Sequence, residues 1–136
     1  MSLFRSDPVV VPRSDSSATI QWRTIRAAER IPFGNRAIYT NGGLGYLFDG
    51  AEISANRIVG ITEGSEVLAG QLFRYMPPGG IIDPAVITML GSLWVNESGL
   101  LVSYSGVTTG KFSRRVAIGI PERAISVSFG EVVKKE

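Results

Sequence analysis

Among its 136 residues the sequence contains neither cysteine nor histidine. Without cysteine there is no disulfide, no thiolate metal ligand and no thiol nucleophile, so packing and hydrogen bonding must hold the fold together. Without histidine the chain lacks the commonest zinc ligand and the side chain that titrates near neutral pH. These absences argue against enzymatic chemistry. We therefore expect a protein that is not an enzyme and that needs no cofactor.

Long apolar runs are missing as well. No stretch reaches the roughly 18 apolar residues that a membrane helix requires, and Met1 to Pro8 do not show the basic-then-apolar order of a secretory signal. We therefore expect a soluble protein, made in a cytoplasm, with no membrane partner. A chain of 136 residues that is 44% hydrophobic fits one domain with its own core.

Lysine is scarce, and arginine takes its place. The chain has 14 basic residues against 12 acidic ones, and only three of the basic residues are lysines. Arginine is weakly hydrated and forks onto carboxylates, so it is enriched at protein interfaces from which lysine is depleted. The bias favours assembly with another protein, although a general compositional preference for arginine explains it equally well.

Short apolar runs alternate with turns between residues 56 and 129. Clusters of glycine, proline, asparagine and serine separate the runs, and such clusters end strands and set turn geometry. No segment keeps a helical period over several turns, so the pattern predicts an all-β protein, built as a single small β-barrel or β-sandwich. The six strands expected in this region are 57–61, 71–75, 92–95, 100–104, 116–120 and 124–129.

Further strands are expected outside these six. Residues 20–25 alternate polar and apolar side chains, and residues 36–40 and 44–48 flank an Asn-Gly sequence typical of a type I′ hairpin turn. The stretch 77–90 is too apolar for a solvated loop. It contains either one more strand, at 85–88, or a large excursion over a core or a partner.

The expected organisation has three parts. Residues 1–19 hold two prolines around a valine triplet and little periodicity, which predicts an extended N-terminal arm. Residues 20–130 form the β-domain, and residues 131–136 form a charged C-terminal tail. Such an arm can contact a neighbouring protein by adding a strand to the edge of its sheet.

Glycine-rich stretches in the chain do not form nucleotide-binding motifs. Asn41–Gly45 is followed by no helical run and no Gly-Lys-Ser/Thr, and Gly110-Lys111 is followed by phenylalanine. Hairpin glycines are the better interpretation. The basic excess of the first 36 residues is not interleaved with aromatic residues, so we expect no specific nucleic-acid binding.

Two carboxylate pairs are candidates for catalytic acids, because glycosidases place two acids across a sugar. They are Asp49 with Glu52 and Glu63 with Glu66, and both lie in turn-like sequence. Solvated turn acids explain them better, and a small polysaccharide-active enzyme using Asp49 and Glu52 is the weaker alternative. Trp94 is predicted to be a core residue.

The second half of the chain carries a recurring pattern. A strand ends in Val-Gly-Ile, a Leu-Trp-Val hairpin with a glycine turn follows, and an Ile-Gly-Ile strand precedes the last strand. The segments that carry the pattern are 57–62, 69–71, 79–83, 91–101, 117–120 and 124–127. Together they resemble a β-module of tailed-bacteriophage structural proteins, as found in capsid decoration or cement proteins and in fibre knobs.

The resemblance implies a non-enzymatic virion protein that sits on the capsid exterior, binds between major capsid protein subunits as a homotrimer, and stabilises the head. The alternative that it implies is a tail, neck or fibre component, or a receptor-binding one. An extended arm and arginines suit either role, because arginine pairs with acidic protein loops. The residues expected to contact the capsid or another copy are Arg5, Arg13, Arg23, Arg26, Arg30, Arg36, Ile81 and Ile82.

Overall fold

The computed structural model describes residues 20–136. The expected arm at residues 1–19, with Arg5 and Arg13, lies outside the described residues. In the described part, strands dominate, and the expected all-β class is confirmed. The elements in chain order are β1 (Arg23–Ala27), β2 (Ala37–Asn41), β3 (Leu44–Leu47), α1 (Glu52–Asn56), β4 (Ile58–Thr62), β5 (Leu72–Met76), β6 (Ile81–Ile82), β7 (Gly91–Val95), β8 (Leu101–Val102), η2 (Tyr104–Gly106), β9 (Phe112–Ser113), β10 (Arg115–Ile120), β11 (Ala124–Val127) and β12 (Val133–Lys134).

Strands β1 to β5 close into a barrel in the order β1-β3-β2-β4-β5. The pairing of β1 with β3 is parallel, with Arg26 opposite Leu44, and the other pairs are antiparallel. The interior is narrow, because a Cβ on Gly45 would lie 2.9 Å from the ring of Phe73. The barrel therefore needs a glycine at this position of β3, because the Phe73 ring of β5 occupies the space that a side chain would fill.

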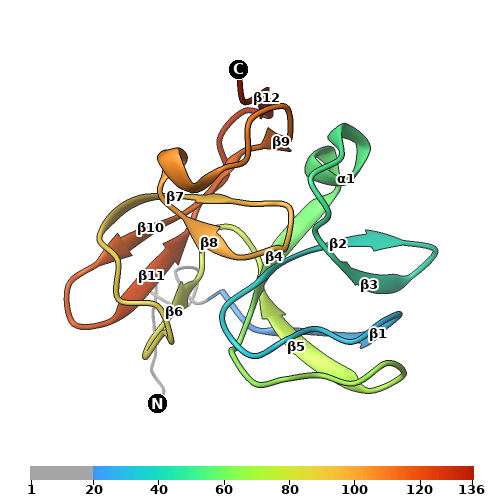
Figure 1. Ribbon diagram of the computed structural model, residues 1–136. Coiled ribbons are helices and arrows are strands. Elements are labelled where there is room, and N and C mark those ends of the chain that lie inside the picture. The colour runs from blue at the N-terminus through green and yellow to red at the C-terminus, as the bar shows by residue number, and fades with distance from the viewer. Residues whose placement is uncertain (1–19) are drawn as a thin grey trace, which may run out of the picture.

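A second sheet of five strands, in the order β6-β11-β10-β7-β8, lies beside the barrel. Figure 1 shows the barrel at the right of the view and this sheet at the left, with the small β9–β12 ribbon above them. All of its pairs are antiparallel, and a bulge interrupts the β10–β7 register between Arg115 and Ala117. The expected barrel is thus present, and an open sheet packs against it.

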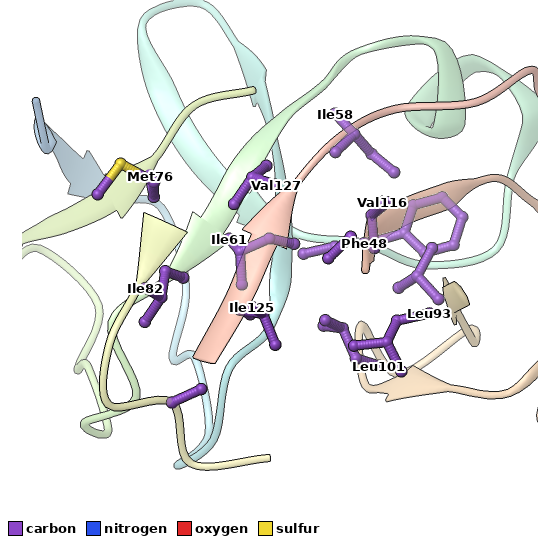
Figure 2. Packing of buried hydrophobic residues seen from close by; sticks show 14 of the residues in the cluster. Phe48, Ile58, Ile61, Met76, Ile82, Leu93, Leu101, Val116, Ile125 and Val127 are labelled. Carbon is purple, nitrogen blue, oxygen red and sulfur yellow. The ribbon is translucent and has the colours of Figure 1, made fainter. Parts of the chain in front are cut away.

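The buried side chains form two clusters. The smaller one fills the barrel with residues that include Ile31, Ile38 and Phe73. The larger one lies between the barrel and the second sheet, and Figure 2 shows its members from both regions side by side. Phe48 and Ile61 come from the barrel side, whereas the second sheet contributes the residues Ile82, Leu93, Leu101, Val116, Ile125 and Val127. The two regions therefore share one core.

Most of the expected strands are present, with shifted ends. The hairpin of β2 and β3 is confirmed, and its two loop residues are Gly42 and Gly43, both with positive φ. The first strand begins at Arg23 rather than Ile20, and the run 100–104 holds only β8 before the η2 turn. The strand expected at 85–88 is wrong, because the extended pairing in that stretch is made by Ile81 and Ile82 with β11.

The C-terminal residues also differ from the expected charged tail. Val133 and Lys134 form β12, which pairs with β9 at Ser113 and Phe112. The side chain of Lys135 donates hydrogen bonds to the carbonyls of Tyr104 and Val107 and lies 4.5 Å from the centre of the Tyr104 ring. The chain end is therefore part of the fold.

Candidate interaction surfaces

The acids Glu63 and Glu66 are each engaged by an arginine. Arg74 donates two hydrogen bonds to Glu63, of 3.1 Å from Nε and 2.6 Å from Nη2, and Arg30 donates to Glu66. The hydrogen bonds from Arg74 lower the pKa of Glu63, and the charge of Arg74 adds to this effect. Both acids border a shallow pocket of about 180 Å³ beside the start of β5. Because their oxygens accept from arginine, the arrangement favours two surface ion pairs over a catalytic pair.

The other acid pair lies at the start of α1. Asp49 accepts a hydrogen bond from the backbone N–H of Ala51, and Glu52 stands in the first turn of the five-residue helix. Both side chains are exposed. A carboxylate near a helix start is favourable because the first amide N–H groups there have no helical partner. The geometry therefore gives Asp49 and Glu52 a local structural role.

The expected arginines fall in two places. Arg23 and Arg26 are exposed on β1, on the wall of the barrel, and Arg26 donates a 2.6 Å hydrogen bond to the carbonyl of Gly70. Arg30 and Arg36 lie in the connection between β1 and β2. Burial lowers the pKa of Arg36, and the charge of Arg30 lowers it further. Arg30 and Arg36 thus belong to the same connection, whereas Arg23 and Arg26 belong to a strand of the barrel wall.

The two expected isoleucine contacts point in opposite directions. Ile82 is 2% exposed and belongs to the shared core, so it is not available for contact at the surface. Ile81 is 53% exposed. Neighbouring residues of a strand point to opposite faces of a sheet, and therefore only Ile81 lies on the face turned away from the barrel.

This outer face of the second sheet is largely apolar. Directly paired residues share a face, so Ile81 is in one row with Ser126, Ile118 and Ser92. Two residues further along β7, Trp94 is on the same face, opposite Val102 of β8. Arg115 of β10 is paired with Trp94 and lies on the same face. We call the residues Ile81, Ser92, Trp94, Val102, Arg115, Ile118 and Ser126 the outer face.

Trp94 is half-buried on the outer face, so its expected place in the core is wrong. Its neighbours Leu93 and Val95 are the core residues of β7. The ring of Trp94 packs edge to face against Tyr104, with centroids 4.8 Å apart and planes at 66°. The alternation of β7 fixes which residues share a face, but it does not reveal which of the two faces is covered.

A second exposed group gathers around Phe33, which is 63% exposed. Arg36 donates hydrogen bonds from Nε and Nη2 to the carbonyl of Phe33 and from Nη1 to that of Ser98. Leu100 forms an isolated β-bridge with Arg36, and Val86 packs against the backbone beside Gly64. We call the residues Arg30, Phe33, Arg36, Val86 and Leu100 the Phe33 surface.

Buried hydrogen bonds fix the backbone under the Phe33 surface. The Asn35 side chain is buried, donates to the carbonyl of Thr62 and accepts from the N–H groups of Val86 and Ile87. The Thr62 hydroxyl donates to the carbonyl of Gly34 and accepts from the N–H of Arg36. Loops from the barrel and from the second sheet are thereby joined into one rigid unit.

Sequence reasoning predicted Arg30 and Arg36 and missed Phe33. The signal was an aromatic residue between Pro32 and Gly34, in a stretch with no strand pattern. A large apolar side chain flanked by turn residues has little chance of burial. Such a side chain is a candidate anchor for a partner.

Comparison of the chain with protein-family models, with curated proteins and with solved structures gives no match. None of the helices in residues 20–136 has the length and apolarity needed to cross a membrane. Over the same residues, acidic side chains do not gather in threes in a way that would hold a metal ion. Function is therefore inferred from the outer face and the Phe33 surface.

Proposed function

We propose that the protein is a non-enzymatic structural protein of a tailed-bacteriophage virion, and specifically a capsid decoration or cement protein. It would bind the major capsid protein on the outside of the head. The observation that carries the proposal is the outer face, where Ile81 is exposed and Ile118 and Trp94 are only partly buried among residues 20–136. Exposed apolar faces of this kind mark protein contacts.

Two separate surfaces suit a protein that bridges its neighbours. The outer face belongs to the second sheet, whereas Arg30, Phe33 and Arg36 come from the connection between two barrel strands. A cement protein must contact at least two capsid subunits at once. After the first contact has formed, the second forms within the same complex, so two modest affinities combine into a strong one. The shared core keeps the two surfaces in a fixed relation, which favours simultaneous engagement.

The sheet edges of the protein favour binding through side chains over binding by strand addition. The barrel is closed and has no free edge, and the edge strands β6 and β8 of the second sheet are two residues long. Short edges offer few backbone groups for strand addition. Apolar side chains and arginines would therefore carry the binding, as they do in many protein interfaces.

The test is to mix the purified protein with undecorated heads of the parent phage. The expected result is saturable binding with a fixed number of copies per capsid subunit and a higher melting temperature of the heads. Equal melting of heads with and without the protein would contradict the stabilising role. Light scattering on the protein alone tests the homotrimer that the resemblance implies.

A tail, neck or fibre component, including a receptor-binding one, is the second candidate. The observation that favours it is the Trp94–Tyr104 pair on the outer face, because aromatic side chains at a surface stack against sugars and other flat partners. The number of copies separates the two roles: copies over the whole shell indicate cement, and a few copies at one vertex indicate the tail. Binding on a glycan array would favour the receptor role.

A further inference from the structure

The Phe33 surface combines the features of a binding hot spot. The exposed ring of Phe33 stands beside Arg36, which donates two hydrogen bonds to the Phe33 carbonyl, and phenylalanine and arginine are both enriched at the centres of protein interfaces. Figure 1 shows the connection between β1 and β2 running back from the barrel towards the second sheet. Hydrogen bonds of Asn35 with Val86 and of Arg36 with Ser98 join this connection to loops of the second sheet.

The arginine side of this surface favours an anion. Within residues 20–136, no carboxylate lies within 4 Å of the Arg36 guanidinium, whereas Arg30 is paired with Glu66. Three of the five N–H groups of Arg36 donate to the carbonyls of Phe33 and Ser98, and the other two have no acceptor within residues 20–136. A carboxylate is the natural acceptor for these N–H groups, because it neutralises the charge of the guanidinium as it accepts from it.

The rigidity of the surface lowers the cost of binding. Arg36 itself holds the backbone of Phe33 through two hydrogen bonds, and the buried Asn35 fixes the loop below. A side chain that is already in its bound position loses less entropy when a partner arrives. Arg36 thus acts both as a cation and as a positioning residue for Phe33.

We propose that the Phe33 surface binds an acidic segment of the partner protein, in which a carboxylate meets Arg36 and an apolar side chain packs on the Phe33 ring. The inference rests on the proposed function, because it names the chemistry of the partner that the virion protein recognises.

The experiment uses the full chain, labelled with ¹⁵N, and a synthetic twelve-residue peptide of glutamates around a central Leu-Phe pair. The control peptide has lysine in place of every glutamate. The expected result is saturable shift changes in the amides of residues 30–36, 63–67, 83–87 and 96–100 with the acidic peptide only, weakened by added salt. Changes spread over β1, or equal changes with the lysine peptide, would overturn the proposal.

Matched variants sharpen the test. Phe33→Ala and Arg36→Gln should each weaken peptide binding by about tenfold or more. Ile53→Ala and Arg26→Gln are the controls, because Ile53 on α1 is 62% exposed, as Phe33 is at 63%, and Arg26 is another exposed arginine bonded to a carbonyl. The controls should bind as the parent does. Equal binding by Phe33→Ala and the parent would exclude the surface.

The outcomes keep this inference and the proposed function apart. Heads that bind the parent and Phe33→Ala equally well would leave the decoration role intact and remove the Phe33 surface from it. Peptide binding without any binding to heads would retain an acidic-segment site and reject the decoration role. Since Phe33 is exposed, Phe33→Ala should keep the melting temperature of the parent, which shows that a loss of binding is not a loss of folding.

Discussion

The barrel and the second sheet bury their strands in different ways. Every barrel strand pairs on both sides, and the barrel fills its own interior with side chains such as Ile38 and Phe73. The second sheet is open, packs one face on the barrel and leaves Ile81 and Ile118 on the other. The closed region is therefore suited to be a scaffold, and the open sheet supplies the face on which a partner can bind.

The largest expected effect tests whether the two regions fold as one. Phe48→Ala removes a fully buried ring from the shared core and should lower the free energy of unfolding by about 3–5 kcal/mol. Ile81→Ala, on the outer face, should change it by less than about 0.5 kcal/mol. Urea unfolding followed by circular dichroism measures both. A small effect of Phe48→Ala would mean that the barrel is stable without the second sheet.

The two tryptophans allow the same comparison region by region. Trp22 precedes β1 of the barrel and Trp94 lies in β7 of the second sheet. Trp22→Phe leaves Trp94 as the only fluorescent tryptophan, and Trp94→Phe leaves Trp22. Because one core joins the regions, the urea transition followed by fluorescence should match the transition followed by circular dichroism in each variant. Separate midpoints for the fluorescence and dichroism of one variant would show that the regions unfold independently.

A smaller effect is expected where a single side chain ties the regions together. Asn35→Ala removes three hydrogen bonds and leaves a buried carbonyl and two N–H groups without their side-chain partner, which should cost about 2–3 kcal/mol. In this variant the amides of Val86 and Ile87 should exchange with solvent faster than they do in the parent, whereas the amides of β4 should change less. Unchanged protection at Val86 and Ile87 in the variant would show that Asn35 does not hold this loop.

The smallest effect concerns the ion pair of Glu63 with Arg74 on the barrel. The pKa of Glu63 is lowered in the folded protein, so the pair stabilises above the unfolded pKa of about 4.3, and this stability is lost as the pH falls through the folded pKa. Both side chains are more than 40% exposed, so solvent screens the pair and its contribution to stability is small. Glu63→Gln should lower stability slightly at pH 7. The difference from the parent should vanish near pH 3, and a difference that persists there would contradict the assignment.

Local patterns predicted the regular part of the fold. The adjacent Gly42 and Gly43 allow the positive φ values of a tight hairpin, and alternation marked the long strands such as β10 and β11. These features depend on neighbouring residues alone. For the same reason the class and most of the strands could be predicted from the sequence.

Pairings between distant segments could not be predicted in this way. β6 and β9 have two residues each and exist because β11 and β12 lie beside them. A run of two residues carries no periodicity. The apolar residues at 85–88 resembled a strand, but Ala85 is buried and Val86 and Ile87 donate to Asn35, a polar side chain 50 residues away. Tertiary contacts decided these positions.

The candidate surfaces were predicted in part. Composition indicated Arg30 and Arg36, and the apolar loop indicated Ile81, but alternation gave no preference between the two faces of β6 and β7. Which face is covered depends on the barrel that packs against the sheet. This is why Ile82 and Trp94 were placed on the wrong sides.

The proposed decoration role depends most on binding of the capsid to the outer face of the second sheet. Ile81→Lys and Ile53→Lys place the same charge at two exposed isoleucines, one on the outer face and one on α1. Binding of each variant to undecorated heads, with the melting temperature of each variant as a check on folding, gives the direct test. The account predicts unchanged melting for both variants and loss of binding for Ile81→Lys alone, whereas equal binding by both would contradict it.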